Sequence, residues 1–317
     1  MTPLMANNLD YLAARLHGRR SRMAEAERLD ALCRTRSVAE LSRALLAGTE
    51  LQAAADLQRR LVQDLVRELA GFRGHAGGAG SRLIEWMLVR FQVENLKVLA
   101  RGFATRASLD DFAAHVPRGP LRKGFLQAAA IYRDQPRPFF LEAALDRAWF
   151  AELLARAGAV SDEDEEVIRA LVRQEADIFH LMLAARGRFH YGLAPELLLP
   201  LHVAGTNIPR GRFAAMLADS DLATAAGRIV GRVIDSLPPE VDAEALEALA
   251  WNRFARLANR AFRRSHIGLG AVVGYVGLRR VEIANLITLS EGIRAGVASE
   301  AIRARMTPRA GLEAAHV

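Results

Sequence analysis

One pattern of residues occurs three times along this chain of 317 residues, and it limits the possible folds more than any other feature. Its five positions follow the spacing i, i+3, i+4, i+7 and i+10, and they occupy residues 92–102, 177–187 and 282–292, which we call the marker segments. In chain order, the residues at these positions are Gln92, Asn95, Leu96, Leu99 and Gly102, then Asp177, His180, Leu181, Ala184 and Gly187, then Glu282, Asn285, Leu286, Leu289 and Gly292. Residues at this spacing lie on one face of an α-helix, and the closing glycine suits a C-terminal cap. The pattern therefore predicts three related helices.

Two further agreements favour a genuine internal repeat over chance. A Leu-Glu-Ala triplet precedes the second and the third marker glycine by 46 residues, so these two copies keep an offset of 105 residues. A Pro-Arg pair follows every marker segment, at residues 117–118, 209–210 and 308–309. Such agreement is typical of a chain built from several versions of one unit.

The Pro-Arg pairs divide the chain into three helical units, residues 1–116, 117–208 and 209–317, the last of which includes the C-terminal tail. Solenoid repeats are usually about 20–45 residues long, so units of this size disfavour a solenoid. Hydrophobic residues make up 51% of the chain but aromatic residues only 6%, and alanine and leucine, which favour helices, dominate. The predicted fold class is all-α.

Helical periodicity is expected over most of the chain. Ser37 and Glu40 form a capping-box pattern at the start of one helix. Glycines dominate residues 71–80, which predicts a flexible connector, and prolines at both ends of residues 195–209 predict an irregular loop. The ranges expected to be mainly helical are 9–31, 51–69, 83–101, 141–157, 213–237, 243–264 and 281–296.

The chain carries a formal net charge of +7, from 43 lysine and arginine residues against 36 acidic residues. A basic chain could bind an acidic partner such as nucleic acid or an anionic membrane surface. Only Lys97 and Lys123 are lysines, however, and the arginines are scattered among acidic residues, as expected for solvated helix faces. No basic stripe with interleaved aromatic residues occurs, so we expect no nucleic-acid partner.

Cysteine use and hydropathy both favour a cytoplasmic protein. Cys33 is the only cysteine, which excludes a disulfide framework and allows a reduced compartment. Polar residues interrupt the N-terminal stretch where a signal peptide would be apolar. The longest nearly apolar run, residues 267–278, is too short to cross a hydrocarbon layer of ~30 Å as a helix. We therefore expect membrane association only through partners.

Three stretches look like sites of binding or catalysis, and each has a simpler structural explanation. Residues 268–274 match a G-x-G-x-x-x-G dinucleotide fingerprint, but a charged helical stretch precedes them where this motif needs a strand, so a close-packed turn between two helices is favoured. Residues 71–80 lack the lysine and the Ser or Thr of a P-loop. Asp177 and His180, with His190 further along, are too few for a metal site, so a polar pair on a helix face is favoured. We expect no catalytic residue, no cofactor and no metal.

The third marker segment ends a longer motif, residues 274–292, of the form G-Y-x-x-x-R-x-x-E-I-x-N-L-x-x-L-x-x-G. Together with residues 11–16, 37–41, 141–146 and 208–211, in this order along the chain, it resembles the C-subunit family of V/A-type rotary ATPases, whose eukaryotic vacuolar member is called the d subunit. The resemblance covers essentially the whole chain, and its motifs are structural rather than catalytic.

Three features depart from the family's pattern. Gln92 stands where the third marker segment has an acidic residue, His180 stands where the other two have asparagine, and the connector at residues 71–80 is unusually rich in glycine. These departures affect details of partner contact more than the fold.

The resemblance implies a non-catalytic adaptor in which three pseudo-equivalent helical units form a funnel with pseudo-threefold symmetry. The implied partners are the central-shaft subunits and the proteolipid of the membrane rotor ring. The adaptor would couple shaft and ring during ATP-linked proton or sodium transport, at the cytosolic face of the membrane. Two alternatives remain open: an unrelated all-helical scaffold or binding protein, and a helical enzyme with a hidden site.

Arg118, Arg210 and Arg309 are the candidate partner-contact residues, because each follows a proline in the loop after a marker segment. If a pseudo-threefold axis relates the units, the three arginines lie around one rim and present positive charge to an acidic or carbonyl-rich partner surface. The alternative is that each proline occupies the first position of a helix and the arginine is merely solvated.

Overall fold

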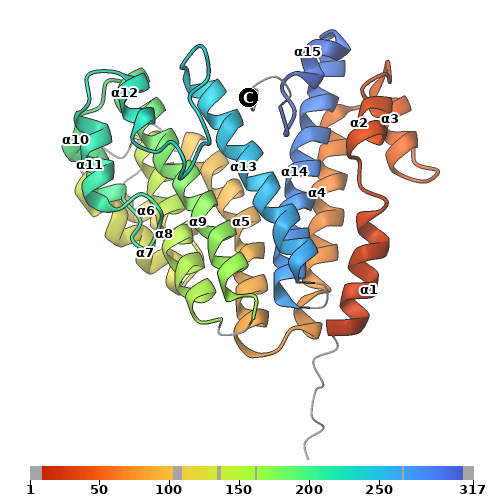
Figure 1. Ribbon diagram of the computed structural model, residues 1–317, viewed down its shortest axis with the longest axis horizontal. Helices are drawn as coiled ribbons and strands as arrows, with labels where there is room; N and C mark the ends of the chain where they lie inside the picture. The colour runs from red at the N-terminus through yellow and green to blue at the C-terminus, as the bar shows by residue number, and fades with distance from the viewer. Residues whose placement is uncertain (1–8, 103–108, 134–136, 161–162, 266–267, 310–317) are drawn as a thin grey trace, which may run out of the picture. The chain divides into compact units, whose positions relative to one another are not determined.

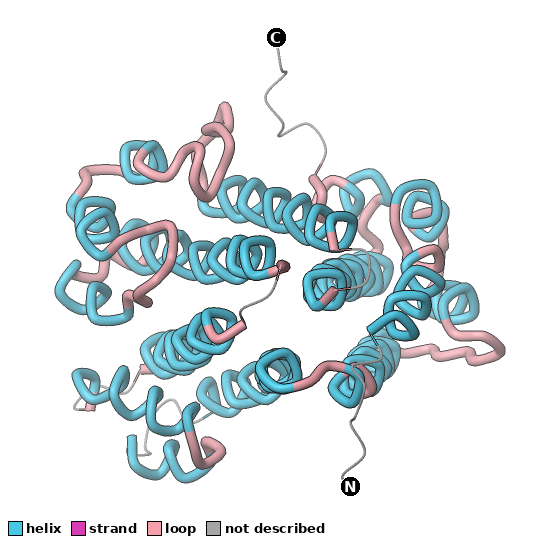
Figure 2. Tube along the Cα trace, turned by 60° about the horizontal axis from the view of Figure 1, so that its bottom comes forward, coloured by secondary structure: helices cyan, strands magenta, loops and turns pink. Residues whose placement is uncertain are grey.

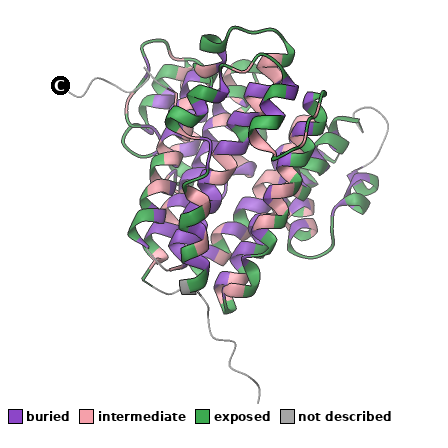
Figure 3. Ribbon diagram, turned by 90° about the vertical axis from the view of Figure 1, so that its right-hand side faces the viewer, coloured by how far each residue is buried: buried purple, intermediate pink, exposed green. Residues whose placement is uncertain are grey.

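The computed structural model describes residues 9–102, 109–133, 137–160, 163–265 and 268–309. Helices and turns account for these residues, and the only strand-like feature among them is one isolated bridge between Val230 and Ile234 (Figure 2). Buried residues form stripes along the helices, with exposed residues on the opposite faces (Figure 3). The predicted all-α class is confirmed.

The chain forms two compact units. The terminal unit combines residues 1–81 with residues 251–317, and the central unit consists of residues 82–250. The chain passes between them within two long helices, α5 (Gly78–Gly102) and α13 (Ala243–Arg264). The three-part division at residues 116 and 208 stays a prediction.

The terminal unit begins with four helices, and a tertiary contact decides where the first one ends. The helix expected over residues 9–31 is in fact two, because Ala24 donates its backbone N–H to the Glu282 carboxylate rather than to a helical carbonyl. The capping-box prediction is confirmed: the Ser37 hydroxyl accepts from the Glu40 N–H at 3.1 Å. The four helices are α1 (Leu9–Arg20), α2 (Ala26–Leu32), α3 (Val38–Leu45) and α4 (Ala54–Ala70).

The glycine-rich connector is more ordered than the sequence predicts. A 3-10 turn, η1 (Arg73–His75), follows α4, and α5 begins at Gly78. Phe72 is buried and its ring centroid lies 5.9 Å from that of Tyr275, so the start of the connector packs into the core. The expectation of a flexible linker is therefore wrong.

The terminal unit ends with α13, α14 (Leu269–Arg294) and α15 (Ser299–Arg303), and α14 packs against α1 and α4 (Figure 1). Residues 269–274, predicted as part of a turn, are the start of α14. A Cβ at Gly274 would lie 2.6 Å from the Ala258 carbonyl oxygen of α13. The predicted close approach of two backbones is thus confirmed, although it lies between two helices and not in a turn.

The central unit is built around α8 and α9, with shorter helices packed around them (Figure 1). The indole nitrogens of Trp86 and Trp149 each donate to the other's carbonyl oxygen, at 3.0 and 3.1 Å. Its elements, besides parts of α5 and α13, are α6 (Leu109–His115), α7 (Pro120–Ala129), η2 (Ala130–Tyr132), α8 (Pro138–Gly158), α9 (Glu165–Met182), the π-helix η3 (Leu183–His190), α10 (Pro195–Leu198), η4 (Leu199–Leu201), α11 (Arg210–Ala218) and α12 (Leu222–Gly227).

Two expectations for the central unit need correction. The long helix expected over residues 213–237 is broken, because the Asp221 carboxylate accepts from the Thr224 N–H and starts a new helix, α12, which ends at Gly227. The loop expected at residues 195–209 contains α10 and η4, which proline at the first helical turn favours.

The marker glycines serve close packing more than helix termination. The residues after Gly102 lie outside the described residues, so its predicted cap is untested, and the helices continue past Gly187 and Gly292. A Cβ at Gly187 would lie 2.9 Å from Leu198, and one at Gly292 would lie 2.5 Å from Ile302. These glycines let the following short helix, α10 or α15, pack directly on the marker helix.

Candidate functional site

The third marker segment binds the residues around the last Pro-Arg pair. Asn285 of α14 accepts the N–H of Thr307 at 2.9 Å and donates to its carbonyl oxygen at 2.6 Å. Asn252 of α13 makes the same two-way contact with Arg309, at 2.8 and 3.1 Å. Two amide side chains therefore satisfy the main-chain groups on both sides of Pro308, each bond contributing about 1 kcal/mol to stability.

The second marker segment binds the residues before Pro209, with different chemistry. The Asp177 carboxylate accepts the backbone N–H groups of Asn207 and Ile208, at 3.1 and 3.0 Å. His180 Nε2 accepts the N–H of Val203 at 2.9 Å. Both side chains are fully buried on α9. We call residues 203–208 the α9-bound segment.

These contacts show what the side chains of Asp177 and His180 bind. The two side chains bind backbone N–H groups, and the described residues contain no cluster of His, Cys, Asp or Glu that could hold a metal ion. The polar-pair interpretation is confirmed, with a role that the sequence did not reveal: the pair determines the position of the segment that leads to Arg210.

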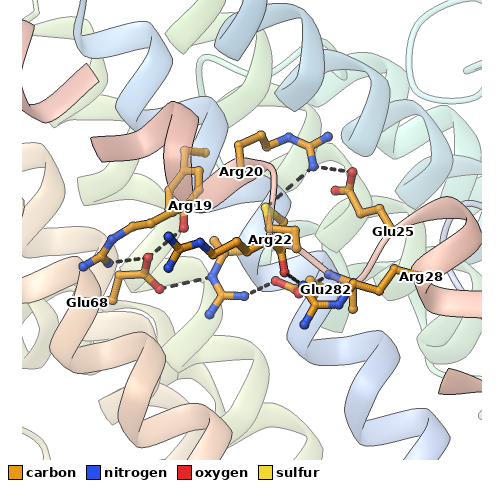
Figure 4. A network of polar contacts seen from close by, with 11 residues as sticks. Arg19, Arg20, Arg22, Glu25, Arg28, Glu68 and Glu282 are labelled. Carbon is orange, nitrogen blue, oxygen red and sulfur yellow. Dashed lines mark hydrogen bonds and ion pairs between the residues drawn. The ribbon is translucent and has the colours of Figure 1, made fainter. Parts of the chain in front are cut away.

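The acidic residue of the third marker segment belongs to a buried ionic network that joins α1, α4 and α14 (Figure 4). Glu282 contacts Arg279, and Arg279 Nε also lies 3.1 Å from Glu68. Glu68 further accepts from the Tyr275 hydroxyl at 2.7 Å and from Arg19 at 2.5 Å. Burial raises the pKa of Glu68, but Arg279, Tyr275 and Arg19 together outweigh it and hold the pKa below its ordinary value.

The first marker segment makes no equivalent contact within the described residues. Gln92 and Asn95 are exposed, although Leu96 is buried as the pattern requires. The segment before Pro117 is held instead by Arg122, whose guanidinium donates to the carbonyl oxygens of Val116 and Ala114, at 2.7 and 2.9 Å. Among the described residues, therefore, only the second and third marker helices use polar side chains to bind the segment near the following Pro-Arg pair.

The three candidate partner-contact arginines differ in their surroundings. Arg118 is exposed in the turn before Gly119, which has a φ of 105° and caps α7. Arg210 is exposed at the first position of α11, with Nη1 3.3 Å from the Leu199 carbonyl oxygen. Arg309 is half-buried.

The alternative interpretation of the Pro-Arg pairs is wrong in its detail. Pro209 is the N-cap of α11 rather than its first residue, and Pro117 precedes the cap of α7. The residues after Arg309 lie outside the described residues, so at Pro308 this interpretation stays a prediction.

Sequence inspection missed a second repeated contact, which links each marker helix to one of the helices α8, α13 and α4. In each marker segment, one side chain makes this contact: it belongs to the residue nine positions after the first. Its partner is a Glu or Gln that directly follows a buried leucine. Arg101 forms a bidentate pair with Glu142 at 2.8 and 3.0 Å, Arg186 lies 2.5 Å from Glu247, and Glu291 accepts from Gln58 at 2.6 Å.

These contacts identify the missing part of the first copy. Glu142 and Glu247 belong to the Leu-Glu-Ala triplets, and Gln58 follows Leu57, so Leu57-Gln58 is the divergent counterpart of those triplets. The glutamates of the triplets stand 35 residues before their marker segments, and Gln58 stands 34 before the first, which is the signal that could have revealed it.

The comparisons with known proteins identify the family of this chain. The model of the ATP synthase (C/AC39) subunit family matches residues 12–130 and 106–305. The chain belongs to this family. The C subunit of a V-type ATP synthase from Deinococcus radiodurans is 24% identical over 91% of this chain and 88% of its own length. The C subunit of an A-type ATP synthase from Methanosphaera stadtmanae is 21% identical over 59% of this chain and 51% of its own length.

Membership in the ATP synthase (C/AC39) subunit family confirms the resemblance carried by the sequence motifs and shows that this protein is a rotary ATPase subunit. The motif at residues 274–292, which carried that resemblance, is α14 together with its contacts to α1, α4 and α13. Its glycines, Gly274 and Gly292, allow close helix packing. Tyr275, Arg279 and Glu282 belong to the ionic network described above. None of the described helices is both long enough and apolar enough to cross a membrane.

Proposed function

We propose that this chain is the non-catalytic central-stalk adaptor of a V/A-type rotary ATPase. It would join the central-shaft subunits to the proteolipid ring at the cytosolic face and couple ATP turnover to proton or sodium transport. The observation that carries the proposal is the family match over residues 12–305. The chain would reach the membrane only through these partners and would not bind or hydrolyse ATP itself.

We further propose that three related units, divided at residues 116 and 208, form a funnel with a pseudo-threefold axis into which a shaft could fit. The contact of each marker helix with a Leu-Glu or Leu-Gln pair of another copy supports the relation between the units. Close helix packing, as at Gly274, gives such a body the low compressibility that transmission of torque requires.

We propose that Arg118, Arg210 and Arg309 contact an acidic or carbonyl-rich partner surface. Exposed charges of this kind mainly change the association rate and its salt dependence. The marker-helix contacts described above would then fix the loops that carry Arg210 and Arg309.

The test combines deletion with reconstitution. Loss of the chain should separate the membrane ring from the ATPase head, and ATP hydrolysis by the head should no longer drive ion uptake into vesicles. The triple variant R118E/R210E/R309E should fold normally but reassemble more weakly, with a changed salt dependence.

A variant with the same change of charge, R34E/R232E/R305E, is the matched control, because these three arginines are exposed, as Arg118 and Arg210 are. Coupled pumping without the chain would contradict the adaptor role. Equal reassembly of both triple variants would contradict only the choice of arginines.

A further inference from the structure

Two arginines of the central unit, Arg147 of α8 and Arg210 of α11, bring positive charges close together. Their elements meet through η4, which packs against both α8 and α11 (Figure 1). Arg147 is half-buried, and its Nε is buried without a hydrogen-bond partner within the described residues. Arg210 is exposed, and its one hydrogen bond described above leads to the Leu199 carbonyl oxygen of η4. One guanidinium is therefore buried and unsatisfied beside another that is open to solvent.

No carboxylate among the described residues compensates the charge of Arg147. The groups that act on it are the Tyr132 hydroxyl and Arg210. Burial raises the pKa of Tyr132, whose hydroxyl donates to the Leu197 carbonyl oxygen, so this group is neutral. Burial lowers the pKa of Arg147, Tyr132 opposes this, and the charge of Arg210 lowers it further. Because arginine stays protonated near neutral pH, the two side chains repel each other.

The start of α11 adds to the positive potential. Its N-cap, Pro209, makes no side-chain cap, and its first turn contains Arg210 and Arg212 but no acidic residue. The first N–H groups of a helix lack intrahelical partners and favour negative charge, so arginines are unfavourable there. The next helix, α12, has the ordinary arrangement, with Asp221 as its cap. Only an added anion would give the start of α11 the charge that such helix ends favour.

The terminal unit shows the same place with its contacts satisfied. Asn252 and Arg147 each stand five residues after the glutamate of a Leu-Glu-Ala triplet. Asn252 binds the main chain of Arg309, the arginine of the third Pro-Arg pair, and Arg147 lies beside Arg210, the arginine of the second. A neutral amide satisfies this position in one unit, while two cations without a counter-charge occupy it in the other.

We propose that Arg147 and Arg210 form a binding site for one carboxylate, supplied by an acidic side chain of a partner subunit. A carboxylate suits the planar guanidinium group, and Arg101 already binds Glu142 in this bidentate way within the same unit. It would give Arg147 an acceptor and replace the repulsion between the arginines by attraction to a shared anion. The choice of a partner subunit rests on the proposed adaptor function, whereas the carboxylate site itself does not.

Acetate is the probe for the site in the isolated full chain. It replaces chloride at constant ionic strength, and the backbone N–H signal of Gly211, in the first turn of α11, reports binding by NMR. The signal should shift saturably, and Arg147→Gln and Arg210→Gln should each weaken acetate binding by about tenfold. Arg232→Gln is the matched control, because Arg232 is an exposed arginine of the same unit, and it should bind acetate like the wild type.

Three results of this titration would overturn the proposal. A wild-type chain without a saturable shift has no such site. Equal acetate binding by all four proteins would show that the two arginines do not form it. Saturable binding of inorganic phosphate without binding of acetate would contradict the choice of a carboxylate.

Thermal unfolding tests the coupling between the arginines and does not require equal stability of the variants. In chloride, Arg210→Gln should raise Tm more in the wild type than in the Arg147→Gln background, because the two charges repel. In saturating acetate the order should reverse, since the bound anion then stabilises a chain that has both arginines. The same order in both salts overturns the proposal.

Reassembly with the shaft and ring subunits tests the source of the carboxylate. Arg147→Gln should weaken reassembly, and free acetate should inhibit reassembly of the wild type more than that of the variant. Acetate binding together with unchanged reassembly of Arg147→Gln overturns the choice of a partner subunit. Failure of the adaptor function is distinguishable, because coupled pumping without the chain would contradict that function and leave the acetate titration as it is.

Discussion

The terminal and central units each bind the segment near a Pro-Arg pair to a marker helix, but they use different side chains to do so. In the terminal unit, Asn285 and Asn252 pair with Thr307 and Arg309 through neutral amides. In the central unit, a carboxylate and an imidazole hold the α9-bound segment by accepting its N–H groups. What the two contacts share is the helix face and the chain position, so geometry has been retained while the hydrogen-bonding chemistry differs.

The comparison is tested most strongly by the buried leucines of the two marker helices. Leu286 is 2% exposed and Leu181 is fully buried, so Leu286→Ala and Leu181→Ala should each lower the free energy of unfolding by about 2–5 kcal/mol. Urea unfolding, followed by circular dichroism, measures both. Leu99→Ala is the control, since Leu99 is 43% exposed, and it should have a much smaller effect. A negligible cost at either buried leucine would show that the two marker helices are not equivalent core elements.

Alanine substitution of the polar side chains should destabilise the two units to different extents. Asp177→Ala leaves the N–H groups of Asn207 and Ile208 without an acceptor, and we expect a loss of about 3 kcal/mol. Asn285→Ala should cost only about 1 kcal/mol, because Thr307 is partly accessible to water and Asn252 still holds Arg309. Asp177→Asn keeps one acceptor oxygen, so its loss of unfolding free energy should lie between those of the two alanine variants. Equal losses for the two alanine variants would contradict the view that only the central contact depends on a buried charge.

Two glycines of α14 should respond differently to an added methyl group. A Cβ at Gly274 meets backbone atoms of Ala258 and Phe262 at 2.6 Å, so Gly274→Ala should destabilise the protein by about 1–3 kcal/mol. At Gly292 the nearest atoms are Cδ1 and Cγ1 of the buried Ile302 side chain, both at 2.5 Å, and a side chain can shift more readily than the backbone. Gly292→Ala should therefore cost less, because the gain of about 0.5–1 kcal/mol from replacing a helical glycine offsets the crowding. Thermal unfolding of the two variants gives the comparison, and a larger loss for Gly292→Ala would reverse it.

The smallest effects are expected at the three contacts that repeat around the chain. Arg101 is exposed and pairs with Glu142, so a double-mutant cycle on this pair should give a coupling of about 0.2–1 kcal/mol that falls with added salt. Gln58 and Glu291 include only one charge, so their coupling should depend less on salt. Equal salt dependence of the two cycles would show that charge is not what distinguishes these contacts.

Several elements were predictable because their signals are local. The Ser37 cap, α13 and the buried leucines of the marker helices follow from side-chain spacing and from hydrogen bonds within one turn of chain. The family resemblance also lay in the sequence, because its motif in α14 is an unbroken stretch. The positions of Arg118, Arg210 and Arg309 were visible, but their role as partner contacts stays a prediction.

The polar contacts at the candidate site were not predictable in the same way. Asn252 lies 57 residues before Arg309, and Gln58 lies 233 residues before Glu291. No local pattern marks such residues, since asparagine and glutamine on a helix face are equally common in solvent. Only comparison of the offsets between copies could have drawn attention to Gln58.

By itself, the sequence determined which residues form helices, which helix faces are buried and which family the chain resembles, because periodicity and capping act over a few residues. The tertiary structure decided where several of those helices end and what the glycines do. The break after α1 depends on Glu282, the order of the connector depends on Phe72, and Gly187 and Gly292 admit α10 and α15 instead of ending their helices. The physical reason is that each of these features depends on a partner beyond the few residues over which periodicity and capping act: 258 residues away for Ala24, and in the next short helix for Gly187 and Gly292.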